Sequence, residues 1–171
     1  WPLSTPEYPK HLLNIVGEKS LLQNTFERAK RVTSVDRIYI STEASHSEHV
    51  IAQLPELTKE QVIIEPARRD TMPCILNALQ FISTRHDHKE PIASIHADHH
   101  VRDVEGFVHG LKKAGEVSSE HGRITLLGME PTRPDVKYGY IHKGRIFDDE
   151  ELVYDIANFK EKPQYEIAQE Y

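Results

Sequence analysis

Cysteine is almost absent from the 171-residue sequence, where Cys74 stands alone. A single cysteine cannot form an intrachain disulfide, and without a cysteine pair no zinc or redox motif built from paired thiols is present. Long apolar runs are missing as well, since none approaches the ~20 residues that a membrane span needs. The first residues also lack the basic and then apolar stretches of a signal peptide. We therefore expect a soluble, cytoplasmic protein with no membrane partner.

An excess of positive charge is also lacking. The chain has 21 Lys and Arg against 27 Asp and Glu, a formal net charge of -6 at pH 7. Nucleic-acid binding therefore has no overall electrostatic footprint, although a local basic pocket for phosphates remains compatible with this charge. What the chain does contain is 38% hydrophobic residues, enough for one ordinary core. One domain is the default expectation for this length.

Strand-like and helix-like segments alternate along the chain. Helical spacing of apolar residues marks residues 18–32, 45–54, 71–85 and 104–118, and short apolar segments mark strands at 37–42, 61–65, 91–97 and 124–129. This alternation predicts an α/β, Rossmann-like fold with a mostly parallel sheet flanked by helices. Beyond residue 131 we expect strands at 138–142 and 152–159, a turn at Lys143-Gly144, and a helix from residue 164.

Polar groups follow several of the predicted strands. In parallel α/β sheets, ligands bind beyond the carboxyl ends of the strands, so these loops are the candidate site. The loops contain Glu65-Pro66 with residues 68–71, Asp98-His99, residues 137–139, and Glu161-Lys162-Pro163.

Histidine is abundant, with 11 residues, and three of them lie beside Asp98: His96, His99 and His100. On a strand that ends at Asp98, side chains alternate, so His96 and Asp98 share one face and His99 takes the other. Most histidines are surface or hydrogen-bonded groups. We therefore do not expect a dedicated histidine metal site.

Successive short strings form an ordered set along the whole chain. They are Trp1-Pro2-Leu3-Ser4, Tyr8-Pro9-Lys10, residues 20–25, Glu65-Pro66, residues 69–73, Ala97-Asp98-His99, residues 138–141 and residues 159–163. Together they resemble, in the same order, the motifs of sugar-1-phosphate nucleotidyltransferases, and within that family the guanylyltransferase branch that uses mannose 1-phosphate. Ordered agreement of this length is a strong signal, whereas any one string would be weak.

The resemblance implies a nucleotide-diphospho-sugar transferase fold and transfer of GMP from GTP to mannose 1-phosphate, giving GDP-mannose and pyrophosphate. It assigns Lys10 to the nucleotide phosphates and Asp98 to a catalytic Mg²⁺ beside them. Both roles suit this chemistry. Phosphoryl-type transfer needs a cation where oxyanions develop, and Mg²⁺ prefers a hard ligand such as a carboxylate oxygen. The alternatives are a solvated loop lysine and an aspartate that caps the following helix.

The resemblance also places Glu65 at the base of the nucleotide. A carboxylate there can accept hydrogen bonds from both N1-H and the exocyclic amino group of guanine. The alternative is that Glu65 caps the next helix or pairs with Arg68 or Arg69.

The rest of the implied nucleotide site comprises Arg69, Asp70 and Thr71, with Arg69 neutralising phosphate. Asp70 stands where the family usually has asparagine, and Met72 where it usually has alanine. An aspartate lacks the amide donor and adds negative charge near a nucleotide. A non-catalytic, nucleotide-sugar-sensing homologue is therefore an alternative function.

For the sugar phosphate, the resemblance implies Gly139, Glu161 and Lys162. The glycine would allow the sugar to approach the backbone, Glu161 would hold hydroxyls, and Lys162 would bind phosphate. A strand bulge and a solvated surface pair are the alternatives. Another sugar nucleotidyltransferase, using glucose 1-phosphate with dTTP or ATP, is a further alternative.

The family's motifs extend beyond the sequence on both sides. Its glycine-rich loop would precede Trp1, and its second metal carboxylate would follow Tyr171, so we expect residues 1–171 to form a partial nucleotidyltransferase domain. On this interpretation the 171 residues alone show little or no activity. The expected partners are GTP and mannose 1-phosphate, with no nucleic acid, and a homodimer is compatible with the family.

Overall fold

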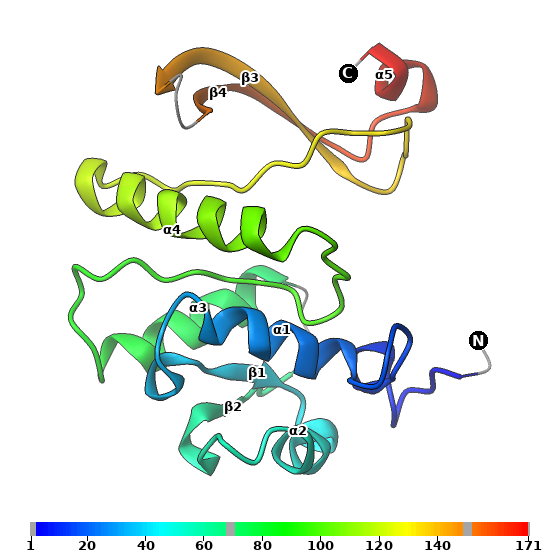
Figure 1. The fold of residues 1–171 in the computed structure, drawn as a ribbon, viewed down its shortest axis with the longest axis vertical. Helices are drawn as coiled ribbons and strands as arrows, with labels where there is room; N and C mark the ends of the chain where they lie inside the picture. The colour runs from blue at the N-terminus through cyan, green and yellow to red at the C-terminus, as the bar shows by residue number, and fades with distance from the viewer. Residues whose placement is uncertain (1–2, 68–70, 149–151, 171) are drawn as a thin grey trace. The chain divides into compact units, whose positions relative to one another are not determined.

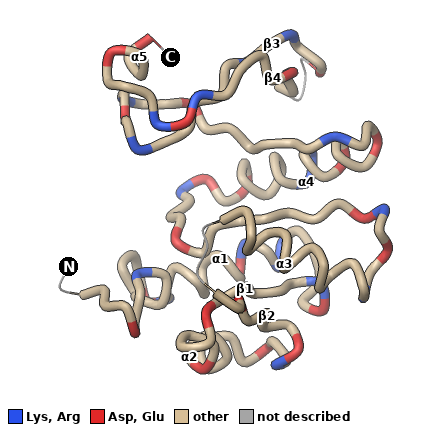
Figure 2. The backbone as a smooth tube through the Cα atoms, turned by 180° about the vertical axis from the view of Figure 1, so that it is seen from behind, with Lys and Arg blue, Asp and Glu red and all other residues tan. Residues whose placement is uncertain are grey.

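The computed structural model describes residues 3–67, 71–148 and 152–170. It divides into two compact units, Trp1–Thr125 and Leu126–Tyr171. Figure 1 shows the order of their elements along the chain, and Figure 2 shows acidic and basic residues interspersed along both units. Within the described ranges, no helix combines the length and apolar character that a membrane span requires.

The first unit is an α/β arrangement around a short parallel strand pair. Its strands β1 (Ile40–Thr42) and β2 (Val62–Ile64) pair in parallel, with Ile40 opposite Val62. The strand pair lies between helices α1 and α2 (Figure 1). The helices are α1 (Leu21–Lys30), α2 (Ser47–Gln53), α3 (Thr71–Ser83) and α4 (Val104–His121), with short 3₁₀ turns at Lys10–Leu12, Val35–Arg37, Ala44–His46 and Lys59–Gln61.

Helix α1 begins with a capping box. The Ser20 hydroxyl accepts from the backbone N–H of Gln23, and the Gln23 side chain accepts from the backbone N–H of Ser20. These reciprocal bonds satisfy backbone donors that the first turn leaves open. The apolar stripe of α1 then faces the core, as its helical spacing predicted.

The core of the first unit joins that stripe to β2, α2 and the turns around them. Its buried members are Leu12, Leu22, Phe26, Ile38, Val50, Leu54, Leu57 and Val62. Ala97 packs against the edge of this cluster, although it lies far along the sequence. The core therefore brings the segment before Asp98 close to α1.

Two predicted strands, residues 91–97 and 124–129, have no strand pairing in the described structure. Apolar composition does not create a strand without a neighbouring backbone to pair with. The Ala97 carbonyl, for example, accepts instead from the side chain of Thr25. His96 and His99 were expected on opposite faces of a strand. A turn at Ala97–Asp98 instead brings the centres of their rings to 5.1 Å from each other.

The second unit is an antiparallel hairpin followed by a short helix. Strand β3 (Gly139–Asp148) pairs with β4 (Val153–Glu161), and α5 (Tyr165–Glu170) follows. The predicted turn at Lys143-Gly144 was wrong, because both residues lie within β3 where the register shifts. A Cβ atom on Gly144 would lie 2.9 Å from the Asp155 carbonyl oxygen. The glycine therefore permits a close strand approach at a bulge, not a chain reversal.

Candidate functional site

Lys10 and Asp98 form an ion pair in the first unit. Lys10 opens the 3₁₀ turn Lys10–Leu12, which the buried Leu12 anchors in the core. Asp98 lies in the turn after residues 91–97. The Lys10 Nζ to Asp98 Oδ2 distance is 2.6 Å, and the two side chains are 59% and 30% exposed. The fold thus brings together the two residues that the sequence assigned to phosphate and metal.

The carboxyl group of Asp98 is held in its ionised form. Burial raises its pKa, but the hydrogen bond and charge of Lys10, followed by the charges of His99 and His96, outweigh burial, so the net pKa is lowered. An ionised, partly exposed oxygen is the kind of ligand that Mg²⁺ prefers. The described residues contain no group of three or more metal-ligating side chains. Asp98 could supply one carboxylate ligand to a Mg²⁺, an ion that commonly shares substrate phosphates with one or two protein carboxylates.

The turn that carries Asp98 is tied to helix α1. Thr25 Oγ1 donates to the carbonyl of Ala97 at 3.4 Å, and Arg28 Nη2 donates to the carbonyl of His99 at 3.1 Å. The motif comparison used the string 20–25 but missed Arg28. The sequence does contain a feature that could have pointed to Arg28. It is a cation on the apolar face of the helix, three residues after Thr25 and seven after Leu21.

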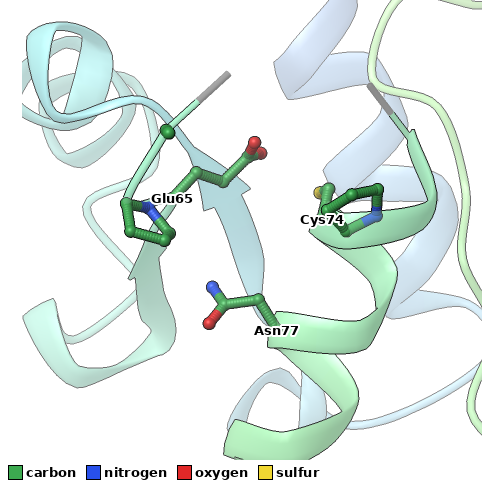
Figure 3. Close-up of a pocket in the computed structure, with 6 residues that line it drawn as sticks. Glu65, Cys74 and Asn77 are labelled. Atoms are coloured by element: carbon green, nitrogen blue, oxygen red, sulfur yellow. The ribbon is translucent and has the colours of Figure 1, made fainter. Parts of the chain in front are cut away.

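Glu65 lies at the end of β2 beside a cavity of about 300 Å³. Its backbone N–H donates to the Thr42 carbonyl, which ties it to the end of β1. In Figure 3 its side chain points towards α3, which carries Cys74 and Asn77. The cavity is lined by Glu65, Pro66, Ala67, Pro73, Cys74 and Asn77.

Two consecutive hydrogen bonds, from Cys74 to Ser41 and from Ser41 to Glu65, support the Glu65 carboxylate. The Cys74 thiol donates to Ser41 Oγ at 3.3 Å, and the Ser41 hydroxyl donates to Glu65 Oε1 at 3.4 Å. Burial raises the Cys74 pKa, the hydrogen bond with Ser41 lowers it, and the neighbouring Glu65 carboxylate raises it, so the net pKa is raised. The thiol therefore stays protonated as a donor. Sequence reasoning missed Ser41, Cys74 and Asn77, because none of them belongs to a recognisable motif.

The remaining predicted nucleotide-binding residues follow the cavity-lining residue Ala67 along the chain. Arg69 and Asp70, with Arg68, lie outside the described residues. Thr71 is the first residue of α3 and is exposed.

The predicted sugar-phosphate residues come together at one end of the β3–β4 hairpin. Gly139 lies opposite Glu161, and the Lys162 N–H donates to the Tyr138 carbonyl at 3.1 Å. A Cβ atom on Gly139 would lie 2.5 Å from Phe159 Cζ and 2.8 Å from Glu161 Oε2. A side chain there would displace both, so the glycine lets Phe159 and Glu161 lie close against this strand end.

A sequence profile of the nucleotidyl transferase family matches residues 1–171. The chain therefore belongs to the nucleotidyl transferase family.

Named relatives make the class more specific. A mannose-1-phosphate guanylyltransferase from Escherichia coli is 34% identical over 176 residues, covering 100% of this chain and 38% of that protein. One from Salmonella montevideo is 35% identical over 178 residues, covering 100% and 36%. The chain thus spans well under half the length of these relatives.

A solved structure supports the fold. The crystal structure described as mannose-1-phosphate geranyltransferase from Thermus thermophilus matches with a TM-score of 0.85 and 32% identity, covering 100% of this chain and 48% of that one. The predicted α/β nucleotidyltransferase fold is thereby confirmed.

Proposed function

We propose that the full-length protein transfers GMP from GTP to mannose 1-phosphate, producing GDP-mannose and pyrophosphate. The observation that carries the proposal is the 2.6 Å contact between Lys10 Nζ and Asp98 Oδ2, which pairs a cation with a carboxylate at a partly exposed site. The names of the relatives supply the choice of nucleotide and sugar.

In the proposed reaction, a phosphate oxygen of mannose 1-phosphate attacks the α-phosphorus of GTP in line, and the bond to pyrophosphate breaks. Positioning and charge stabilisation supply most of the catalysis in such transfers. The Lys10 ammonium has three donors, so it can bind a phosphate oxygen while keeping its bond to Asp98. A Mg²⁺ bound through Asp98 would supply further neutralisation of phosphate charge.

Guanine selection is assigned to Glu65. Its carboxylate borders a cavity of about 300 Å³, which is at the small end of the range for ligand pockets. Three of the lining residues, Pro66, Ala67 and Pro73, offer apolar surface for a flat base. Guanine presents two adjacent donors to a carboxylate, whereas adenine presents an acceptor at N1. This cavity therefore favours GTP over ATP.

The sugar phosphate is assigned to Gly139, Glu161 and Lys162. Glu161 and Lys162 are both exposed, and their charged atoms lie 3.3 Å apart, so a ligand can reach a carboxylate and an ammonium together. Gly139 lies opposite Glu161 and has no side chain of its own, so a sugar that displaces Phe159 could approach the backbone there. The proposal places the reaction in the cytoplasm, where GTP is abundant, and allows a homodimer.

The test is a substrate panel with the full-length protein. Pyrophosphate release is measured for GTP, ATP and dTTP, each with mannose 1-phosphate and with glucose 1-phosphate, in the presence of Mg²⁺. The proposal predicts the fastest release with GTP and mannose 1-phosphate. Faster release with glucose 1-phosphate and dTTP or ATP would assign a neighbouring nucleotidyltransferase activity. Binding of GDP-mannose without any turnover would assign a sensor.

A further inference from the structure

One face of helix α1 holds the backbone on both sides of Asp98. The Arg28 Nη2 group donates to the His99 carbonyl at 3.1 Å and to Thr25 Oγ1 at 2.7 Å. The Thr25 hydroxyl donates onward to the Ala97 carbonyl at 3.4 Å. Two side chains from adjacent turns of one helix therefore donate to the carbonyls of Ala97 and His99, the residues before and after Asp98.

Arg28 is buried in an unusual way for a cation. It is 5% exposed, and its Nε is buried without a hydrogen-bond partner. Its guanidinium lies 5.7 Å from the centre of the Phe107 ring, and burial lowers its pKa. No carboxylate lies within ion-pair distance of Arg28 among the residues that the structure describes.

Burial of an unpaired cation is costly, and an apolar side chain of similar size would often be more stabilising at such a position. The contacts that Arg28 gains in return are to a hydroxyl and to the carbonyl after Asp98. A stability requirement alone does not account for a guanidinium here, whereas a requirement for fixed backbone geometry at residues 97–99 does.

We propose that Arg28, acting with Thr25, is a positioning residue that fixes the turn at residues 97–99 and so aims the Asp98 carboxylate at the metal and phosphate site. The inference rests on the proposed role of Asp98. Because the carbonyls of Ala97 and His99 are held, the peptide group before Asp98 and the one after His99 are both tied to α1, which restricts the backbone on either side of Asp98. The carboxylate then keeps its direction beside Lys10 before any ligand binds.

The contrasting account is that Arg28 only ties α1 to a neighbouring turn. Both accounts predict a loss of stability when Arg28 is replaced. Only the positioning account predicts that metal binding weakens in a protein that is still folded, and that a shorter donor at the same position restores part of it.

The experiment measures Mn²⁺ binding by electron paramagnetic resonance in the full-length protein with GTP present. Mg²⁺ dependence of turnover and thermal unfolding are measured beside it. The variants are Arg28→Met, Arg28→Lys and Thr25→Val. Arg31→Met serves as the matched control, because Arg31 caps the C-terminal end of the same helix but is exposed and pairs with Glu105.

We expect Arg28→Met to weaken Mn²⁺ binding about 10-fold to 100-fold, the usual effect of losing an outer-shell partner of a metal ligand. Arg28→Lys should recover part of the loss, since an ammonium can still donate to a carbonyl and a hydroxyl. Arg31→Met should bind Mn²⁺ like the unmodified protein. A folded Arg28→Met protein with unchanged Mn²⁺ affinity would overturn the proposal.

Thr25→Val provides the second arm if Arg28→Met does not fold. It keeps the shape of the side chain and removes the hydroxyl that contacts both Ala97 and Arg28. Weaker Mn²⁺ binding by Thr25→Val supports the proposal, and unchanged binding overturns it. Asp98→Asn is the reference: if it leaves Mn²⁺ binding intact, the positioning role is also wrong. Absence of turnover with GTP and mannose 1-phosphate would contradict the proposed function only, since Mn²⁺ binding is read independently.

Discussion

The two units each contain a lysine–carboxylate pair, and the pairs are built differently. Lys10 and Asp98 are far apart in sequence, and the first unit brings their charged atoms to 2.6 Å with Asp98 30% exposed. Glu161 and Lys162 are neighbours at the end of a hairpin, with side chains 58% and 65% exposed. The first pair depends on tertiary packing, whereas the second requires only local chain geometry.

The difference extends to the surroundings of each pair. A contiguous buried cluster lies under the first pair and includes Leu12 and Leu22. The hairpin of the second unit instead leaves large apolar side chains such as Ile156 and Phe159 about half exposed. Because an exposed pair contributes little stability on its own, we expect substitutions to have larger and more specific effects around Asp98 than around Lys162.

The largest effect is expected for Asp98→Asn in the full-length protein. The amide keeps the volume but removes the anionic ligand, and several kcal/mol of charge stabilisation correspond to a rate loss of about 100-fold to 1,000-fold. Steady-state turnover at several Mg²⁺ concentrations measures it. The exposed Asp36→Asn is the control. Unchanged turnover of Asp98→Asn at limiting Mg²⁺ would remove Asp98 from the metal site.

The next effect is on the free energy of unfolding, which a core substitution in the first unit should lower more than a substitution in the second. Leu22 is 1% exposed, so Leu22→Ala should lower the free energy of unfolding by about 2–5 kcal/mol through lost burial and a cavity. Ile156 is 45% exposed, so Ile156→Ala should cost less than about 1 kcal/mol. Denaturant unfolding of both variants gives the comparison. A cost for Ile156→Ala equal to that of Leu22→Ala would show that other parts of the full-length protein cover the hairpin.

A smaller, ligand-specific effect is expected for Glu65→Gln. Loss of charged hydrogen bonds to guanine should weaken GTP binding by roughly 1.5–3 kcal/mol, or about 10-fold to 100-fold, and leave ATP binding almost unchanged. Calorimetry with both nucleotides measures the change, with the exposed Glu60→Gln as control. Equal losses for GTP and ATP would remove Glu65 from base recognition.

The smallest effect concerns the Lys10–Asp98 pair itself. Burial raises the pKa of Asp98 and Lys10 more than reverses this, so the folded pKa lies below the unfolded value. Such a group adds stability that is fully present above the unfolded pKa and lost as the pH falls through the folded one. Lys10→Met should therefore cost up to about 1 kcal/mol near neutral pH.

This cost should shrink as the pH falls through the acidic range, because the stability that Asp98 adds above its unfolded pKa is lost as the pH falls through its lowered folded pKa. Denaturant unfolding of Lys10→Met and the unmodified protein across that range measures it. A difference that stays constant with pH would mean that Lys10 stabilises the fold through packing of its alkyl chain, not through Asp98.

The sequence predicted the helices well because their cause is local. The apolar stripe and the Ser20 cap specify α1 within one stretch of chain, and α3 and α4 follow from similar periodicity. Strands depend on partners elsewhere, so residues 91–97 and 124–129 were predicted as strands but have no strand pairing in the described structure. A glycine is typical both of turns and of strand bulges, which is why Gly144 was interpreted as part of a turn and not as a bulge.

The candidate site shows the same division. Motif order predicted roles for Lys10, Glu65 and Asp98 one by one, but no local pattern could show that Lys10 and Asp98 touch. Nor could it show that Arg28 reaches the carbonyl of His99. Contacts of this kind are set by how the helices and turns pack, and single-sequence periodicity carries no information on that packing.

The central claim is that Lys10 and Asp98 act together in nucleotidyl transfer. The most direct test is pyrophosphate release from GTP and mannose 1-phosphate by the full-length protein, measured for Lys10→Met, Asp98→Asn and the double variant. If the two residues act as a unit, the double variant should lose little more activity than the worse single variant. Losses that multiply, or single variants as active as the unmodified protein, would contradict the account.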